Sequence, residues 1–557
     1  MHLKPSWSLL NGPTLLLVCL AVYLPVFWQL PLTRAEGMYG LIPREMLAAG
    51  SWFTPLLNGV PYLDKPHLLY WLNLLSYKIF GVSDWAARVP TLGITLGEVW
   101  VTYLLGRRLL GREAAWLGGF VLLSCIGFFS LHLQILTDYL ITLTLTASLY
   151  FLLRWQEAPA FKWAAPFFLC LVAGFLSKGF IGVVFPVLIG LLYAWRLGQP
   201  RLLLLFLSPQ GLGLAVLLLA PWFVGLEQAH PGFLKFQLVN EQILRFLGQR
   251  QPPDITPFSI PGFWLFLGLW LLPWTFLLPE ALYRFGVATR PGGGADPRAR
   301  LLIFWPAVIL VFFTLSSSRI EYYSLPALPP LALVLGWRLR RYLAAADRSL
   351  SFALLGVGVL GLGTLLLLPY LEALCAGNRR EFSGMFELIL PLAQPVTWMI
   401  PAVSLAGALA GLLRRGRLAA ACYGALALIL VYFTFKVLLA LSPHLSDKLP
   451  GELVQRRAAS QDLLVMEQIE EFEYGASLAF YANRHLLMVS RHGLPQFPYP
   501  VPPAQDYLIT PEQLQGLWQG ARRVYLLIDD ATPPEPFLQG AAVALGLRGK
   551  RLLVNHP

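Results

Sequence analysis

The sequence LLLFLSPQGLGLAVLLLAPWFVGL occupies residues 203–226 and contains no charged side chain. An α-helix needs about 20 predominantly apolar residues to cross the hydrocarbon core of a bilayer. An uninterrupted run of this length is also too long for most strands and too apolar for the surface of a soluble domain. The run therefore predicts a transmembrane helix, and the same pattern recurs along the chain.

The composition of the whole chain is that of a membrane protein. Of the 557 residues, 57% are hydrophobic and only 13% are charged. A soluble domain carries about 25% charged residues, so most of this surface must face something other than water. Lys and Arg exceed Asp and Glu by 42 to 30. The basic residues lie in short gaps between apolar runs, where they are typical of topology signals, so no nucleic-acid partner is expected.

About thirteen apolar runs are long enough to be expected as transmembrane helices. They lie at roughly 10–30, 86–106, 114–131, 133–153, 161–176, 178–196, 203–226, 260–283, 300–316, 322–341, 350–371, 391–412 and 418–440. The first is expected to be a retained helix, because Pro25 and Trp28 stand where a signal-peptide cleavage site would need small residues.

The charges in the gaps predict the orientation of the chain. Alternate gaps are basic, which assigns them to the cytoplasm by the positive-inside rule. These basic residues are Arg107, Arg108, Arg112, Arg154, Lys162, Arg196, Arg201, Arg284, Arg290, Arg298, Arg300, Arg338, Arg340, Arg341, Arg414, Arg415 and Arg417. The opposite gaps contain acidic residues and fewer basic ones. A cytoplasmic N-terminus followed by thirteen spans places the C-terminal segment on the outer face.

The composition changes after about residue 441, where charged residues and prolines become frequent. Short apolar stretches bounded by turn residues, such as Arg523–Asp529 and Leu486–Ser490, are typical of β-strands. The segment Gly451–Glu470 has a helical pattern. The sequence therefore predicts a membrane domain over residues 1–441 and a soluble α/β domain over residues 442–557 on the outer face.

Two outer-face segments, residues 31–84 and 227–259, are too long to be plain connections. Loops of this length in a compact protein are usually functional or disordered. The first is rich in apolar and aromatic residues, so we expect it to be ordered. Within it, Ile42–Leu47 is expected to form a short amphipathic helix at the membrane interface. We therefore expect the functional site to lie on the outer face, in these two segments.

Several motifs follow one another along the chain. They are Arg44-Glu-Met-Leu, Gly50-Ser-Trp, Pro55-Leu-Leu-Asn-Gly59, Tyr62-x-Asp-Lys-Pro-x-Leu-Leu-Tyr-Trp71, Thr137-Asp138, Ser177-Lys-Gly179, Asn240-Glu-x-x-x-Arg-Phe246 and Ser316-Ser-Ser-Arg-x-x-Tyr-Tyr-x-Leu-Pro-x-x-Pro329. Together they resemble the lipid A aminoarabinose transferases. These are family 83 glycosyltransferases, related to the protein O-mannosyltransferases, and have the GT-C membrane fold. The Asp-Lys-Pro segment is the most specific part of the resemblance, which covers most of the membrane domain.

The resemblance implies a transferase of the outer face of a bacterial inner membrane. Such an enzyme takes a sugar from a polyprenyl-phosphate donor and moves it to an acceptor such as lipid A or another glycolipid. Cations at the interface would stabilise the charge that develops on the leaving phosphate. By resemblance, the phosphate-binding cations are Lys65, Lys178 and Arg245, and the tyrosines lining the pocket are Tyr62 and Tyr323. The competing interpretation is that these are ordinary interfacial residues at helix ends.

The chain departs from the family pattern at its acid–base residue. Ala35 stands at the position of the family's catalytic Asp, which leaves Glu36 and Asp138 as the candidate catalytic carboxylates. Three interpretations follow. These carboxylates take over the proton transfer, or an already anionic acceptor needs no base, or the protein has lost the reaction.

A second departure concerns a divalent metal ion that the family places near the phosphate. The resemblance implies Asp64 as its acidic ligand, but Asn240 stands where a histidine is expected. Asparagine is a poor ligand for zinc, although its oxygen suits a harder cation. The resemblance therefore implies one divalent metal site, here with an altered ligand set.

Other functions remain open at this point. The acceptor could be a protein or a polysaccharide, and the replacement of the Asp by Ala35 would suit a catalytically silent homologue. A transporter of lipid-linked sugars is a third alternative. Transporters commonly show repeated halves and broken mid-membrane helices. Neither is visible here, and the polar motifs cluster on one face, which favours the transferase.

Overall fold

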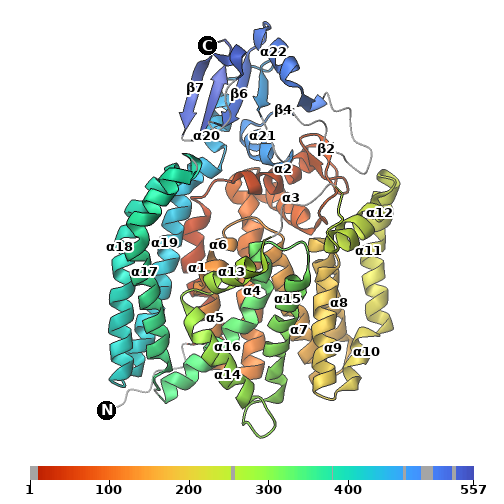
Figure 1. Ribbon diagram of the computed structural model, residues 1–557. Helices are drawn as coiled ribbons and strands as arrows, with labels where there is room; N and C mark the ends of the chain where they lie inside the picture. Colours follow the sequence, from red (N-terminus) through yellow and green to blue (C-terminus); the bar gives the residue numbers. More distant parts are fainter. Residues whose placement is uncertain are drawn as a thin grey trace.

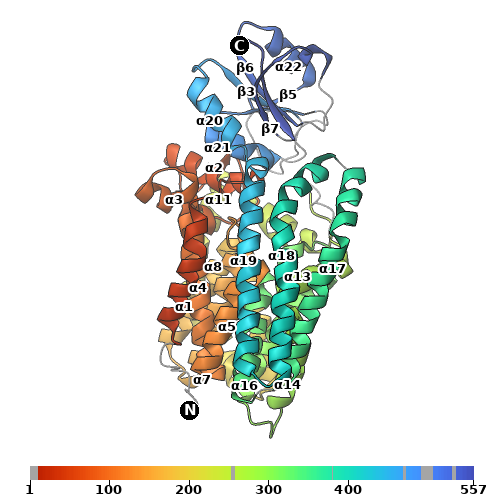
Figure 2. The same cartoon turned by 90° about the vertical axis from the view of Figure 1, so that its left-hand side faces the viewer.

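The structure is a computed structural model, and it describes residues 10–251, 258–345, 347–378, 380–467, 472–490, 506–529, 535–547 and 549–556. It consists of a bundle of long helices with a smaller α/β domain stacked on one end (Figures 1 and 2). The domain boundaries predicted from the sequence, 1–441 and 442–557, stay a prediction. Helix α19 (Gly416–Leu445) extends past the expected boundary at residue 441 before the α/β domain begins.

Each of the expected apolar runs contains a helix. The helices of the bundle are α1 (Gly12–Phe27), α4 (Asp84–Leu110), α5 (Arg112–Ser124), α6 (Ile126–Leu131), α7 (Asp138–Glu157), α8 (Phe161–Lys178), α9 (Ile181–Arg196), α10 (Leu203–Phe206), α11 (Pro209–Ala229), α13 (Ile260–Trp270), α14 (Leu278–Ala288), α15 (Leu301–Leu315), α16 (Leu328–Ala344), α17 (Ser349–Asn378), α18 (Arg380–Leu412) and α19. Within the described residues, seven spans are long and apolar enough to cross a membrane, or eight if a pair bent by 100° counts as one. The chain is therefore a polytopic helical membrane protein, and the finer count of thirteen stays a prediction.

The charge-free run at residues 203–226 is interrupted near its start. Leu207 and Ser208 separate α10 from α11, which begins at Pro209, and the Ser208 hydroxyl accepts a hydrogen bond of 3.3 Å from the amide of Gly211. Pro is favoured in this first-turn position because its missing N–H would be unpaired there in any case. On α11, Val216 and Leu217 are 65% and 69% exposed, as expected for side chains that face lipid.

The first outer segment lies across the top of the bundle (Figure 1). It contains α2 (Arg34–Ala48), the short hairpin β1 (Leu56–Leu57) and β2 (Val60–Pro61), and α3 (Leu68–Phe80). The predicted amphipathic helix at residues 42–47 is the second half of α2. The second outer segment includes α12 (Phe233–Lys235) and a π-helix, η3 (Phe236–Leu244). Both segments therefore occupy the end of the bundle that carries the α/β domain.

In its described residues, the α/β domain contains one six-stranded sheet, in the order β5-β4-β3-β6-β8-β7. Its elements are α20 (Lys448–Arg457), β3 (Leu463–Met466), η7 (Phe472–Gly475), α21 (Ala476–Ala482), β4 (Leu487–Val489), β5 (Leu508–Ile509), α22 (Pro511–Gln519), β6 (Val524–Asp529), β7 (Ala542–Leu547) and β8 (Lys550–Val554). The strands predicted within Leu486–Ser490 and Arg523–Asp529 are confirmed as β4 and β6. The helix predicted over Gly451–Glu470 is wrong over residues 458–467, because the apolar stretch Leu463–Met466 forms a strand between β4 and β6. Residues 468–470 of this prediction lie outside the described residues.

The α/β domain packs closely on α2. A Cβ atom on Gly37 would lie 2.3 Å from the backbone nitrogen of Ser477, so only glycine permits this approach of α2 to α21. Arg34 forms ion pairs of 3.1 Å with Asp447 and with Asp529. These contacts place the C-terminal domain directly over the first outer segment.

Candidate functional site

The three predicted phosphate-binding cations come from separate segments of the outer end. Lys65 lies between β2 and α3, Lys178 is the last residue of α8, and Arg245 follows η3. Lys65 keeps some exposed surface but lies deep in the molecule, and this desolvation, with the charge of Arg245 next in importance, lowers its pKa to about 8. The charge of Lys178 also lowers the pKa of Lys65. The fold therefore brings the three cations within electrostatic range of one another.

Carboxylates surround this cationic group. The Glu241 carboxylate accepts hydrogen bonds from Arg245 Nη1 at 3.3 Å and from Arg250 Nε at 2.7 Å. Arg250 Nη2 also donates to Asp64 Oδ2 at 2.7 Å. Burial and then the charge of Asp64 raise the pKa of Glu241, whereas the neighbouring cations oppose this shift. Acidic and basic side chains therefore contact one another here, and we call Asp64, Lys65, Glu241, Arg245 and Arg250 the charged cluster.

The residues at the predicted metal site do not fit a divalent ion. Asp64 is held by Arg250, and both polar atoms of the Asn240 amide are bonded to the backbone of Gln251, at 2.8 and 2.9 Å. The asparagine oxygen that would face a metal therefore already accepts a backbone N–H. Within the described residues, no group of three or more His, Cys, Asp or Glu side chains could hold a metal ion.

A second pair of predicted residues meets where α7 begins and α8 ends. Asp138 Oδ1 lies 2.5 Å from Lys178 Nζ, and this ammonium group lies 4.2 Å from the centre of the Tyr323 ring. A cation over an aromatic face is attracted by the ring quadrupole. Burial and then the charge of Asp138 raise the pKa of Tyr39 on α2. The structure therefore places Asp138, Lys178 and Tyr323 in one group next to α2.

Glu36 has a different environment. Its carboxylate accepts hydrogen bonds from Arg88 Nη2 at 2.7 Å, Ile135 N at 3.0 Å, Thr33 N at 3.0 Å and the Thr33 hydroxyl at 2.9 Å. The Glu36 and Arg88 side chains are both only 1% exposed. These contacts cap α2 and join it to α4, so they fit a structural role better than proton transfer. The catalytic assignment of Glu36 stays a prediction that its contacts do not favour.

The C-terminal domain contributes Glu473 to the surroundings of the charged cluster, and the sequence analysis did not predict this residue. The Tyr62 hydroxyl donates to Glu473 Oε1 at 2.9 Å, across 411 positions of sequence. Burial and then the charge of Asp64 raise the pKa of Glu473, whereas Lys65 opposes the shift. No local signal marks Glu473, because its relevance depends on how the two domains pack. Arg250 was also missed, although it lies in the segment predicted to be functional.

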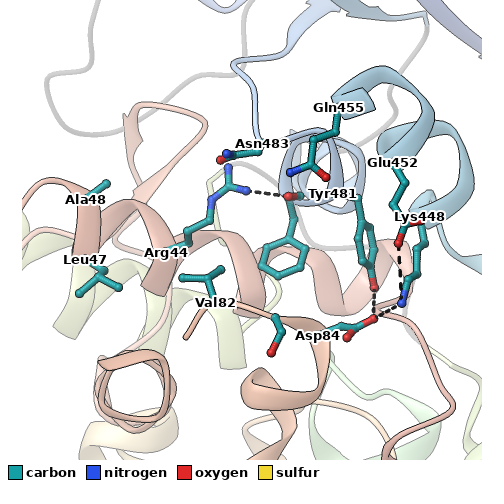
Figure 3. Close-up of a pocket in the computed structure, with 12 residues that line it drawn as sticks. Arg44, Leu47, Ala48, Val82, Asp84, Lys448, Glu452, Gln455, Tyr481 and Asn483 are labelled. Atoms are coloured by element: carbon teal, nitrogen blue, oxygen red, sulfur yellow. Dashed lines mark hydrogen bonds and ion pairs between the residues drawn. The ribbon is translucent and has the colours of Figure 1, made fainter. Parts of the chain in front are cut away.

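A separate cavity of about 470 Å³ lies between α2, α20 and α21 (Figure 3). Asp84 accepts hydrogen bonds there from Lys448 Nζ at 2.6 Å and from the Tyr481 hydroxyl at 3.2 Å. Arg44 extends across the cavity toward α21 and donates to the carbonyl of Phe480 at 2.6 Å. None of the predicted site residues lines this cavity. It is therefore distinct from the charged cluster.

The fold matches that of a known membrane glycosyltransferase. The crystal structure of ArnT from Cupriavidus metallidurans bound to undecaprenyl phosphate superposes with a TM-score of 0.80, covering 98% of this chain and 97% of that one at 20% identity. The same protein in the apo state gives a TM-score of 0.79. Residues 64–224 also match the family model described as dolichyl-phosphate-mannose-protein mannosyltransferase. The fold is therefore that of a polytopic GT-C glycosyltransferase.

Sequence similarity to curated proteins identifies the family within this fold. The chain is 30% identical over 424 residues to a protein of Pseudomonas paraeruginosa, covering 72% of this chain and 71% of the relative. It is 28% identical over 550 residues to one of Edwardsiella ictaluri, covering 95% of each. A third, from Aeromonas salmonicida, is 31% identical, but the chain matches only 58% of its length. All three are named undecaprenyl phosphate-alpha-4-amino-4-deoxy-L-arabinose arabinosyl transferase. The chain belongs to this family of lipid A aminoarabinose transferase-like glycosyltransferases, which confirms the resemblance found in the sequence.

Proposed function

We propose that this protein transfers a sugar from a polyprenyl-phosphate carrier to lipid A or another glycolipid. The observation that supports this most directly is the convergence of Lys65, Lys178 and Arg245 at one end of a membrane bundle. A lipid phosphate needs cations at the depth of its headgroup, and charge-assisted contacts to phosphate are the strong class of hydrogen bond. Tyr62 lies in the same cluster through Glu473.

In the proposed transfer reaction, the cations stabilise the leaving phosphate, and a carboxylate near Lys178 accepts the proton from the acceptor. The bond between the anomeric carbon and the phosphate oxygen breaks, and the polyprenyl phosphate leaves with the electron pair. Lys65 and Arg245 would stabilise the charge that develops on this leaving group. An acceptor oxygen forms the new bond to the anomeric carbon. We assign proton acceptance from an acceptor hydroxyl to Asp138, because its carboxylate has fewer fixed contacts than that of Glu36.

We also propose the finer topology of the chain: thirteen spans in a bacterial inner membrane, with a cytoplasmic N-terminus and a periplasmic C-terminal domain. Both outer segments and the α/β domain share one end of the bundle, which supports this arrangement (Figure 1). The loop between α14 and α15, which carries Arg290 and Arg298, lies at the opposite end. A reporter that is active only in the cytoplasm should be silent when fused after Pro557. Strong reporter activity would contradict the topology.

The donor site is tested by Lys65→Ala and Arg245→Ala in purified protein supplied with an undecaprenyl-phosphate-linked sugar. Each change removes a contact of roughly 1.5–3 kcal/mol, so the transfer rate should fall by more than about tenfold. Arg456→Ala is the matched control, because this side chain is 77% exposed and pairs only with its helical neighbour Glu452 among the described residues. Unchanged transfer in both site variants would contradict the assignment.

The acceptor is tested by mass spectrometry of lipids and glycans from cells with and without the chain. A sugar added to lipid A or another glycolipid is the expected result. A new modification on protein or polysaccharide would assign a different acceptor to the same fold. If no glycan changes and purified protein shows no transfer, the protein is a silent homologue, as the replacement of the family's Asp by Ala35 would then explain.

A further inference from the structure

Arg250 occupies a central position in the charged cluster. Its guanidinium group bridges two carboxylates from separate outer segments, with 2.7 Å to Asp64 Oδ2 and 2.7 Å to Glu241 Oε1. The Arg250 side chain is only 10% exposed and that of Glu241 only 1%. A planar guanidinium with several fixed donors suits such bridging better than the point charge of an ammonium group.

The two carboxylates need a cation between them. Neighbouring buried carboxylates repel each other, and an unpaired buried charge is costly. A divalent metal ion or a protein cation can meet this need. Here Arg250 contacts both groups, and Arg245 adds a further contact to Glu241 at 3.3 Å. The position between the carboxylates is therefore filled by the chain itself.

Asn240 explains how Arg250 is held in this position. Its side-chain amide donates to the carbonyl of Gln251 and accepts from the amide N–H of the same residue. This double contact fixes the backbone next to Arg250. A histidine could not make both bonds in this way, because its two ring nitrogens point in different directions. The asparagine and the arginine thus work together.

We propose that Arg250 replaces a divalent metal ion in the donor site and makes binding of a polyprenyl phosphate independent of metal. Arg250 acts as a positioning residue: it holds Asp64 and Glu241 together, and Lys65 and Arg245 beside them would contact the phosphate. This inference rests on the proposed function for the identity of the ligand. The charge replacement itself rests only on the contacts of Arg250, Asp64 and Glu241.

The first experiment uses the unaltered protein. Metal content is measured by mass spectrometry after purification, and binding of undecaprenyl phosphate is measured by tryptophan fluorescence with and without EDTA. We expect far less than one ion per chain and the same Kd in both conditions. One bound ion per chain, or a loss of more than about tenfold in affinity with EDTA, would overturn the inference.

The second experiment uses Arg250→Ala, which leaves the two carboxylates without their bridge. We expect this variant to bind Mn²⁺, detected by electron paramagnetic resonance, where the unaltered protein does not. Its affinity for undecaprenyl phosphate should fall by more than about tenfold and recover when Mn²⁺ is added. Arg250→Lys should lose less affinity, and Arg456→Ala should bind no Mn²⁺ and keep its affinity.

A merely structural role for Arg250 would not produce rescue by a metal. If Arg250→Ala binds no Mn²⁺ and keeps the affinity of the unaltered protein, the inference fails. If the variant does not fold, the metal content of the unaltered protein and its affinity in EDTA still test whether the site works without a metal ion. Failure of the proposed function is distinguishable, since it would appear as absent transfer or absent lipid binding, whereas the Mn²⁺ measurements need neither.

Discussion

Two carboxylate–cation pairs near the outer end of the bundle differ in how completely they are satisfied. Glu36 and Arg88 are each 1% exposed, and Glu36 accepts hydrogen bonds from three residues. Arg88 also donates to the carbonyl oxygens of Leu30 and Pro31, at 2.7 and 2.9 Å. The acceptor positions of this carboxylate are therefore largely occupied.

Asp138 and Lys178 form the looser pair. Their side chains are 9% and 14% exposed, and Lys178 is the one ion-pair partner of Asp138 in the described part of the chain. The ammonium group also lies over Tyr323, at the edge of the cationic group. A saturated carboxylate holds a structure together, whereas one with remaining acceptor capacity can take a proton. The comparison therefore supports our proposal that Asp138 accepts the proton, whereas the contacts of Glu36 suit a structural role.

The largest expected effect comes from breaking the saturated pair. Glu36→Ala leaves Arg88 as an uncompensated buried charge, which typically costs about 3–5 kcal/mol. We expect a strong loss of folded protein and a lower unfolding temperature in detergent. Glu36→Gln, which keeps some of the hydrogen bonds, should lose less stability and retain turnover per folded molecule. A variant with unchanged stability and a hundredfold slower rate would instead make Glu36 the base.

Asp138→Asn should affect the rate more than the fold. Removing a general base typically lowers the rate by about 10²–10⁴-fold. We expect a fall of this size in kcat for transfer to an acceptor hydroxyl, with an unfolding temperature close to that of the unaltered protein. Glu36→Gln is the matched control for loss of a carboxylate. Transfer that continues at the original rate in Asp138→Asn would indicate an anionic acceptor that needs no base.

The smallest effect is expected from pH, and it tests the cationic group. The pKa of Lys65 is lowered to about 8, so its charge in the empty site is lost as pH rises through this value. Affinity for undecaprenyl phosphate, measured by fluorescence, should therefore weaken above pH 8, by at most about tenfold per pH unit. Lys65→Arg keeps its charge at these pH values and should flatten this dependence. An equally steep decline in that variant would assign the titration to another group.

Much of the fold was predictable because its signals are local. The charge-free run at residues 203–226 contains a helix, since a backbone in lipid must satisfy its hydrogen bonds within the segment. The strand within Arg523–Asp529 was also recognisable from its apolar residues and flanking turns. The helix predicted over Gly451–Glu470 failed in its second half, because pairing with β4 and β6 overrode the helical pattern.

The sequence by itself determined the membrane character, the family motifs and the residue types of the candidate site, because these depend on composition and on spacing along the chain. Only the tertiary structure decided which charges meet. It joined Glu36 to Arg88, Asp138 to Lys178, and Arg250 to Asp64 across 186 positions. The physical reason is that a buried charge is stabilised only by partners within a few ångströms, and packing alone determines which residues come that close.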